Sequence, residues 1–263
     1  MPEAAAAQIR AVDLTLSYGE RIIQSELNFS VSRGDRFIIM GDSGCGKSTL
    51  LKHLIALYRP AKGKIFYENR DLWGMSDEDR GELAQRFGVL YQSGALFSSM
   101  TLGQNIALPI SQYQRLGQAD VRDLVELKLS LVGLAGFGKY MPSEISGGMK
   151  KRAALARAMA LDPEVLFLDE PSAGLDPLSS RLLDELIVEL NESLGTTFLI
   201  VTHELASIFA VGTRAIFLDS DSHHMLASGT PHELLESCPH EKVRRFLNRG
   251  IARPLAANLE PSS

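Results

Sequence analysis

The sequence contains a glycine-rich segment, Gly41-Asp42-Ser43-Gly44-Cys45-Gly46-Lys47-Ser48-Thr49, whose residue types suit the binding of phosphate. The pattern is G-x-x-x-x-G-K-[ST], and it stands between the apolar run 37–40 and a helical pattern that begins at Lys47. Glycines lack a Cβ atom, so the backbone can turn tightly and direct its N–H groups at an anion. Lys47 supplies a positive charge, and the Ser48 hydroxyl is a suitable ligand for Mg²⁺. The segment predicts a nucleotide site formed by Gly41, Ser43, Gly44, Cys45, Gly46, Lys47, Ser48 and Thr49.

Two adjacent carboxylates, Asp169 and Glu170, follow the apolar run 165–168. Such a run predicts a strand that is buried on both faces of a sheet. Adjacent residues of a strand point in opposite directions, so the two carboxylates can have different roles. We expect Asp169 to hold Mg²⁺ and Glu170 to act as the general base that activates a water molecule. The alternative, an acidic turn that closes a core strand, is disfavoured by the presence of the phosphate loop.

Three further side chains stand near the expected ends of strands. Gln92 ends the predicted strand 88–92, where it is either a polar cap or a ligand for the metal or the attacking water. His203 follows the predicted strand 197–201, and its imidazole could donate a hydrogen bond to a γ-phosphate or be purely structural. Tyr18 lies near a turn, and its spacing fits strand packing as well as stacking on a base.

A second segment with the features of an anion site is Ser146-Gly147-Gly148, which opens a basic helical stretch. Small residues, free N–H groups and the positive end of a helix dipole together attract negative charge. Because one phosphate loop is already present, two interpretations remain open. The segment is either a helix cap without a ligand or the part that completes the nucleotide site of another subunit.

The elements that must position these residues alternate between strands and helices, which favours an α/β fold with a largely parallel core sheet. Ligands of such sheets bind at the carboxyl ends of the strands, where Gln92, Asp169 and His203 are expected. Residues 9–32 alternate in hydrophobicity and contain turn signals, which predicts antiparallel strands. Helices are expected at 47–57, 76–86, 178–194, 231–237 and 239–248, and a hairpin at 216–229.

Residues 101–137 have a mostly helical pattern, with a break expected at Pro109. This segment interrupts the strand-rich part of the chain. We therefore expect an inserted helical subdomain over about 95–161, within a domain that spans 9–248. Residues 249–263 contain proline and serine and are expected to form a tail.

Composition limits the function classes. A net charge of -5 over 263 residues argues against a nucleic-acid partner. The two cysteines, Cys45 and Cys238, are too few for a disulfide framework and fit a reducing, cytoplasmic setting. We expect no signal peptide and no membrane span, because the longest apolar stretches have the length of strands. The pair His223-His224 has no further ligands at metal-binding spacing, so we expect a solvated hairpin there.

In order and spacing, these motifs resemble those of the ATP-binding-cassette (ABC) ATPases over residues 9–248. Residues 41–49 resemble the Walker A motif, and Gln92 resembles the glutamine of the Q-loop. Residues 146–149 resemble the signature motif, and 166–170 resemble the Walker B motif. Residues 172–176 resemble the D-loop, and His203 resembles the switch histidine. The resemblance implies a RecA-like core with an N-terminal antiparallel β subdomain and an inserted helical subdomain. It implies ATP and Mg²⁺ as ligands, and Tyr18 at the adenine-stacking position.

The resemblance also implies a head-to-tail dimer that encloses two ATP molecules. Ser146 and Gly148 of one copy would contact the γ-phosphate of the ATP that the second copy holds with its own Lys47. One residue departs from the family pattern, because Met149 stands where the signature usually ends in glutamine. The glycine N–H groups are retained, so the expected contact with phosphate is unaffected.

Residues 145–149, together with 91–97 and 101–109, resemble the Mla-type ATPases, which energise phospholipid transport between the bacterial inner and outer membranes. This resemblance implies a multi-span permease docked at 92–109, a Mce-domain lipid-binding protein and a small STAS-domain subunit near the tail. It implies a peripheral location at the cytoplasmic face of the inner membrane. Two alternatives remain open: the ATPase of an importer for another solute, and a soluble ABC ATPase for iron–sulfur cluster assembly.

Overall fold

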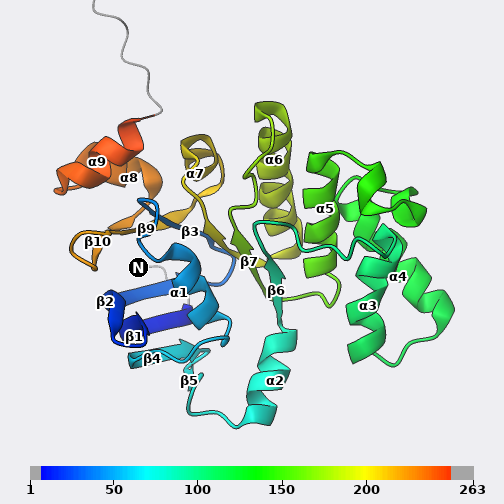
Figure 1. The fold of residues 1–263 in the computed structure, drawn as a ribbon, viewed down its shortest axis with the longest axis horizontal. Helices are drawn as coiled ribbons and strands as arrows, with labels where there is room; N and C mark the ends of the chain where they lie inside the picture. Colours follow the sequence, from blue (N-terminus) through cyan, green and yellow to red (C-terminus); the bar gives the residue numbers. More distant parts are fainter. Residues whose placement is uncertain (1–6, 250–263) are drawn as a thin grey trace, which may run out of the picture.

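The computed structural model describes residues 7–249, which form two sheets with helices packed around the larger one (Figure 1). The larger sheet has six strands in the order β10-β9-β3-β8-β7-β6. Its strands are parallel except for β10, which pairs antiparallel with β9. The bounds are β3 Arg36–Gly41, β6 Phe87–Leu90, β7 Val165–Asp169, β8 Thr197–Val201, β9 Arg214–Leu218 and β10 Met225–Gly229.

The central strands are buried on both faces, and alternate residues enter two different hydrophobic cores. On β3, Ile38 and Met40 belong to one core, whereas Phe37 and Ile39 belong to the other. Strands β7 and β8 alternate in the same way. This arrangement explains the uninterrupted apolar runs of these strands, because neither face meets water.

The second core lies between the large sheet and a smaller sheet of order β2-β1-β4-β5. Strands β1 (Ala7–Tyr18) and β2 (Arg21–Ser32) pair antiparallel, which confirms the strands expected over 9–32. Strands β4 (Lys62–Tyr67) and β5 (Arg70–Asp71) complete the sheet. Helix α1 (Lys47–Leu54) contributes Leu50, Leu51 and Leu54 to this core, so the phosphate loop is fixed at both of its ends.

On the other face, helices α3, α4 and α5 gather at one end of the molecule (Figure 1). Their bounds are α3 Leu102–Tyr113, α4 Gln118–Leu131 and α5 Gly147–Ala158, with short 3₁₀ turns at Phe137–Lys139 and Pro142–Glu144. Side chains such as Ile106 and Leu129 share one continuous core with the sheet. The limits 95–161 for a helical subdomain and 9–248 for the domain therefore stay predictions, and most of the expected tail lies outside the described residues.

The break expected at Pro109 is wrong, because α3 runs through this residue and ends at Tyr113. Proline removes one backbone donor from a helix interior. The buried face of α3, which includes Leu102, Ile106 and Ile110, packs into the core and stabilises the helix in spite of this loss. The chain instead leaves the helical conformation between Gln114 and Gly117.

Other boundaries also differ from the expected ones. Helix α1 ends at Leu54 and not at residue 57, since Ala56 adopts a left-handed conformation with φ 61°. Strand β6 ends at Leu90, so Gln92 lies beyond the strand in a turn closed by the bond from Gly94 N to Tyr91 O. The remaining helices are α2 Asp77–Gln85, α6 Pro177–Leu194, α7 Leu205–Val211, α8 Pro231–Ser237 and α9 Glu241–Asn248. Within residues 7–249, no helix combines the length and the apolar character that crossing a bilayer requires.

Candidate functional site

A cavity of about 790 Å³ opens beside the phosphate loop, at the carboxyl ends of the central strands. It brings together most of the residues that the sequence singled out: Tyr18, Gly41, Ser43, Gly44, Gly46, Lys47, Ser48, Thr49, Gln92, Glu170 and His203. Cys45 does not line the cavity; its side chain is buried, and this burial raises the pKa of its thiol. Cys45 therefore packs beneath the loop, as an inert thiol would.

The glycines of the loop are required by close contacts as well as by conformation. A Cβ atom on Gly41 would lie 2.2 Å from the carbonyl oxygen of Leu218, and one on Gly46 would lie 2.6 Å from Cγ2 of Ile23. Both residues have positive φ, 146° and 101°. The loop can pass this close to its neighbours only because these positions have no side chain.

The Lys47 side chain reaches back across the loop. Its ammonium donates hydrogen bonds to the carbonyl oxygens of Gly41 at 3.0 Å and Asp42 at 2.9 Å. The ammonium also lies 3.9 Å from Sγ of Cys45, a weak acceptor that an anion in the cavity could replace. Lys47 is thereby held as a fixed positive charge at the loop that was expected to bind phosphate.

Ser48 and Asp169 meet although they come from different elements. The Ser48 hydroxyl donates to Oδ1 of Asp169 at 2.8 Å, which joins the start of α1 to the end of β7. A hydroxyl and a carboxylate oxygen are hard oxygen ligands of the kind that Mg²⁺ prefers. Gln92 lines the same cavity and adds an amide oxygen. The donor set therefore fits a magnesium ion bound together with phosphate oxygens.

Glu170 stands at the back of the cavity in an unusual environment. Its side chain is only 11% exposed, and its Oε1 accepts a hydrogen bond from Nδ1 of His203 at 2.7 Å. Its other oxygen, Oε2, is buried and has no hydrogen-bond partner among the described residues. A buried carboxylate oxygen without a donor is costly, and a water bound there would satisfy it. Oε2 is therefore free of protein donors among the described residues, as an oxygen that accepts a proton from water would have to be.

A buried lysine that the motifs did not predict lies behind Gln92 and Glu170. Lys151 of α5 donates from Nζ to the main-chain oxygen of Gln92, and also to that of Glu170 at 3.5 Å. Burial lowers the pKa of Lys151, while the carboxylates of Glu170 and Asp169 oppose this shift. The ammonium thus contacts the main chain of two candidate site residues at once.

Tyr18 lies at the mouth of the cavity with its side chain nearly half exposed. Its ring packs edge-on against Tyr58, with centroids 5.9 Å apart, and its hydroxyl lies 3.4 Å from Oγ1 of Thr49. The ring is therefore packed against a neighbour while the residue remains accessible from the cavity. The role of Tyr18 in stacking on a base stays a prediction.

The segment Ser146-Gly147-Gly148 is not among the residues that line this cavity. It caps α5, where the Ser146 hydroxyl accepts from Met149 N at 3.3 Å, and it lies at the surface. Its N–H groups are therefore not directed at the nucleotide site of the same chain, as far as residues 7–249 show. Both interpretations from the sequence remain possible on this geometry.

The C-terminal helix α9 also reaches the cavity, which sequence patterns did not indicate. Phe246 and Arg249 line it, and Lys242 forms an ion pair with Asp42 of the phosphate loop at 3.3 Å. The same ammonium contacts Asp219 and, at 2.7 Å, Asp221. Arg249 also lies 4.0 Å from the Asp42 carboxylate. The helix itself was expected at 239–248, but no local signal in the sequence could have indicated that it reaches this site.

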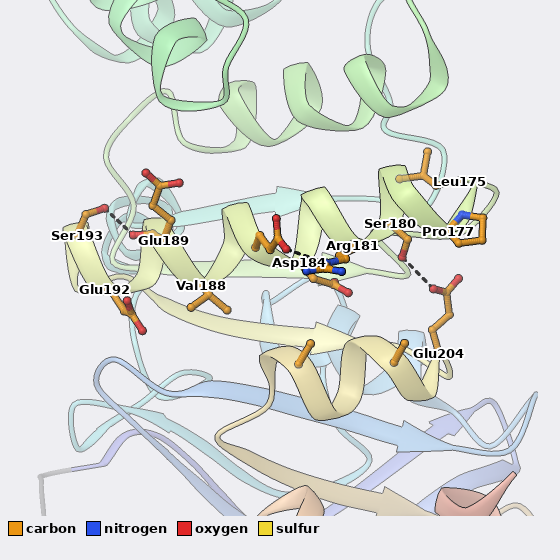
Figure 2. Close-up of a pocket in the computed structure, with 13 residues that line it drawn as sticks. Leu175, Pro177, Ser180, Arg181, Asp184, Val188, Glu189, Glu192, Ser193 and Glu204 are labelled. Atoms are coloured by element: carbon orange, nitrogen blue, oxygen red, sulfur yellow. Dashed lines mark hydrogen bonds and ion pairs between the residues drawn. The ribbon is translucent and has the colours of Figure 1, made fainter. Parts of the chain in front are cut away.

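A larger hollow, of about 1130 Å³, lies between α6 and α7 and includes no residue of the phosphate loop (Figure 2). Its lining includes Arg181 and five carboxylate side chains, those of Asp184, Glu185, Glu189, Glu192 and Glu204. This excess of negative charge opposes the binding of a nucleotide. The smaller cavity beside the phosphate loop is therefore the candidate nucleotide site.

The histidine pair lies against β2. His223 and His224 contact the carbonyl oxygens of Ile23 and Ser25 through Nδ1, at 3.2 and 3.1 Å. Among the described residues, no cluster of three or more His, Cys, Asp or Glu side chains could hold a metal. The pair instead joins the β9–β10 hairpin to β2.

Residues 24–173 match the protein-family model described as "ABC transporter". The "Intermembrane phospholipid transport system ATP-binding protein MlaF" of Haemophilus influenzae is 40% identical over 87% of this chain and 86% of its own length. The "Probable ribonucleotide transport ATP-binding protein mkl" of Mycobacterium leprae is 39% identical over 99% of this chain and 74% of its own length. A solved dimeric ATP-binding cassette, in a post-hydrolysis state with ADP and Pi, superposes with a TM-score of 0.75 at 27% identity and covers 84% of this chain and 98% of that one.

Proposed function

The chain belongs to the ABC transporter family, and on this premise we propose that it is the ATP-hydrolysing subunit of a transporter that moves phospholipid between the inner and outer bacterial membranes. The α/β cassette fold expected from the motifs is confirmed by its solved relatives. The observation that carries the hydrolytic part of the proposal is the buried Oε2 of Glu170, unpartnered among the described residues; Glu170 lines the same cavity as Lys47. The phospholipid cargo is supported by the likeness to the MlaF proteins.

In the proposed site, the phosphate loop from Gly41 to Thr49 holds the phosphates of ATP. The N–H groups of the loop and of the start of α1 would donate to the phosphate oxygens of ATP, and the Lys47 ammonium adds a fixed positive charge. Tyr18 stacks on the adenine ring, and its own ring is packed edge-on against Tyr58. Each of these groups binds ATP without taking part in a proton transfer.

Ser48, Asp169 and Gln92 are the residues that would hold Mg²⁺. The ion would supply positive charge that neutralises phosphate oxygens as negative charge builds on them. The support for this assignment is the contact between Ser48 and Asp169 and the oxygen character of all three side chains.

Hydrolysis in this proposal depends on Glu170 and His203. Glu170 Oε2 accepts a proton from the attacking water, so the oxygen that reaches the γ-phosphate has hydroxide character. His203 holds Oε1 through its Nδ1 and thereby orients the carboxylate. The exposed imidazole also lies where it could contact a γ-phosphate.

A second copy of the chain would complete the site. The exposed Ser146-Gly147-Gly148 segment, at the positive end of α5, would contact the γ-phosphate of the ATP bound by the other copy. The support is twofold: these residues do not line their own cavity, and the related cassette is solved as a dimer bound to ADP and Pi. Met149 donates its main-chain N–H to Ser146, a bond that needs no glutamine side chain.

A permease helix would dock beside Gln92. Phe97 is 49% exposed and Leu108 is 38% exposed, and both line a hollow of about 250 Å³ next to this loop. Arg157 supports the rim, because its guanidinium lies 5.4 Å from the Phe97 ring. Such a docking site would place the chain at the cytoplasmic face of the inner membrane, with a Mce-domain protein and a STAS-domain subunit in the same assembly.

The relatives also supply a competing cargo. The mycobacterial relatives carry the name of a probable ribonucleotide transport protein, at an identity close to that of the MlaF proteins. The importer alternative from the sequence therefore keeps a specific observation in its favour. The iron–sulfur assembly alternative has no such support among these relatives.

Two measurements test the proposal. For the site, Glu170→Gln should retain ATP binding and lose turnover by at least about a hundredfold, the range typical of a lost general base. Unchanged turnover in Glu170→Gln would show that Glu170 is not the general base.

For the cargo, the detergent-solubilised complex should be captured on this chain and analysed for proteins and lipids by native mass spectrometry. A multi-span permease with a Mce-domain protein and enriched phospholipid is the expected result. Recovery of soluble partners without a membrane protein would overturn the transport proposal and favour an assembly ATPase. Recovery of a permease with a second protein that binds nucleotides as cargo, and without enriched lipid, would favour an importer for another solute.

A further inference from the structure

Three consecutive basic residues of α5 have three different environments. Lys150 is exposed, and Arg152 donates to the carbonyl oxygens of Val132 and Gly133 at the end of α4. Lys151, between them, is only 8% exposed and points toward the large sheet. A basic run at the start of a helix suggests a solvated or anion-facing surface, so the burial of Lys151 needs a separate explanation.

Burying an ammonium group is costly unless it is paired or fully hydrogen-bonded. Among residues 7–249, Lys151 has no carboxylate within ion-pair distance of its ammonium. Its partners are two neutral main-chain oxygens, those of Gln92 and Glu170. A lysine that packed only for structural reasons could be replaced by an apolar residue of similar length at lower cost.

The two oxygens belong to segments that have to be positioned accurately. Gln92 follows β6 in an irregular turn, beyond the ladder that holds the strand. Glu170 follows β7 with φ 50°, a left-handed conformation that residues other than glycine rarely adopt. The main-chain N–H of Glu170 donates to Val201 O at 2.9 Å, and its main-chain oxygen accepts from Lys151. The two bonds together fix the main chain of Glu170 on both sides. Backbone conformations of this kind persist only where the surroundings fix them.

Lys151 also lies close in sequence to Ser146, on the first turns of the same helix. Its ammonium therefore connects the helix that begins with Ser146-Gly147-Gly148 to the main chain of the candidate metal ligand and of the candidate base. Any displacement of α5 relative to the sheet would be transmitted to both residues through one side chain.

We propose that Lys151 is a positioning residue, which holds Gln92 and Glu170 in the geometry for hydrolysis and makes that geometry depend on the placement of α5. The inference rests on the proposed roles of Gln92 and Glu170. Lys151 takes no part in proton transfer and does not line the cavity. Its effect is therefore on turnover and not on the affinity for ATP.

The test uses the full chain and compares Lys151→Met, Lys151→Arg and Lys151→Gln with Lys150→Met. Methionine keeps the length and apolar stem of lysine but removes the donors and the charge. Lys150→Met is the matched control, since it makes the same change one residue away on the exposed side of α5. Steady-state kcat and KM, the Kd for ATP and thermal unfolding are measured for each variant.

We expect Lys151→Met to lower kcat by about ten- to a hundredfold, the loss that follows from removing a charged hydrogen-bond donor. The Kd for ATP should stay within about twofold of the wild-type value, and unfolding should occur at a similar temperature. Lys151→Arg should recover most of the turnover, and Lys151→Gln, which keeps a shorter donor, should recover part of it. Lys150→Met should behave as wild type.

Three results would overturn the inference. One is a Lys151→Met protein with wild-type kcat; another is a loss of kcat that Lys151→Arg fails to recover. The third is a parallel loss of turnover, ATP affinity and thermal stability, which would indicate a merely structural role. Glu170→Gln, assayed alongside, separates this inference from the proposed function. If Glu170→Gln is inactive while Lys151→Met is fully active, only the inference fails, whereas an active Glu170→Gln contradicts the assignment of the base.

Discussion

Nδ1 of His203 lies 2.7 Å from Oε1 of Glu170, although the two residues are 33 positions apart in the sequence. The contact joins the ends of β7 and β8, which are neighbours in the sheet. Because Oε1 is occupied by the imidazole, Oε2 is the oxygen left for a water. The orientation of the proposed base is therefore set by a side chain from the adjacent strand.

His203 could act by orienting Glu170 through Nδ1 or by contacting the γ-phosphate, and the contact allows the two roles to be tested separately. Asparagine places an amide donor near the position of Nδ1, whereas glutamine places one near Nε2. If His203 acts by orienting Glu170, His203→Ala should lower kcat by about tenfold or more, and His203→Asn should recover more turnover than His203→Gln. Steady-state ATP hydrolysis at saturating ATP measures this order. The reverse order, with His203→Gln more active, would indicate that contact with the γ-phosphate is the main role.

Tyr18 should contribute to binding through its ring and not through its hydroxyl. Tyr18→Ala should weaken ATP binding by about five- to a hundredfold, which corresponds to the free energy of stacking a base on an aromatic ring. Tyr18→Phe should bind ATP nearly as well as the wild type, because the phenyl ring retains its contact with Tyr58. Titration calorimetry measures both affinities.

Tripolyphosphate provides the control for the Tyr18 variants, since it has the phosphates of ATP but no base. Its affinity should be the same for the wild type and for Tyr18→Ala. An equal loss of tripolyphosphate binding would mean that the substitution has disturbed the phosphate loop near Thr49 and would contradict a stacking role.

Gly41 should tolerate no side chain. In Gly41→Ala, the new Cβ would lie 2.2 Å from the carbonyl oxygen of Leu218, so β3 and β9 would have to separate. We expect a loss of at least about 2 kcal/mol in the free energy of unfolding, together with a loss of ATP binding. Urea unfolding checks the first result and a nucleotide titration the second.

Gly136→Ala is the matched control for Gly41→Ala. Gly136 has φ 79°, and a Cβ atom there would meet no atom within 4 Å. The substitution should cost about 1 kcal/mol through backbone strain alone and leave ATP affinity unchanged. If the two variants were equally destabilised, the close approach of Gly41 to β9 would have no special importance.

Asp184, which lies in the acidic hollow between α6 and α7, should make stability depend on pH (Figure 2). Burial, assisted by the nearby Glu204 and Glu185 and opposed by the hydrogen bond from Ser207, raises the pKa of its carboxyl from 3.8 to about 6. The folded chain therefore keeps this proton to a higher pH than the unfolded chain. The contribution of Asp184 to stability falls as the pH rises from about 4 to about 6 and stays low above that range.

Asp184→Asn removes the buried charge and keeps an oxygen that accepts from Ser207. We expect the variant to be more stable than the wild type at pH 8, by about 1 kcal/mol or more, and to lose most of this advantage at pH 5. Urea unfolding at the two pH values measures the difference. A gain of the same size at both would show that the ionisation of Asp184 is not its cause.

The sequence predicts those parts of the site that are fixed by local constraints. The phosphate loop requires glycines at positions where the backbone has positive φ, and the buried strands require apolar residues on both faces; both requirements leave a readable pattern. The pairing of Ser48 with Asp169 follows, since each residue stands next to such a pattern.

Other features depend on tertiary packing and have no local pattern. The burial of Lys151 could not be separated from the exposure of Lys150, because both belong to one basic run. The helix through Pro109 was missed because a proline weakens a helix locally, whereas the core that stabilises α3 comes from distant residues. The contribution of Phe246 and Arg249 was missed since α9 is an ordinary amphipathic helix, whose position depends on the whole fold.

The ion pairs of Lys242 have a consequence for the synthesis of the chain. The phosphate loop precedes α9 in the chain and therefore emerges from the ribosome before it. Until α9 folds, Asp42, Asp219 and Asp221 have to approach one another without the cation that joins them. Their mutual repulsion opposes the final shape of the loop. ATP stabilises only the folded state that binds it. It would therefore stabilise chains that have been translated to the end of α9 more than chains that stopped before it.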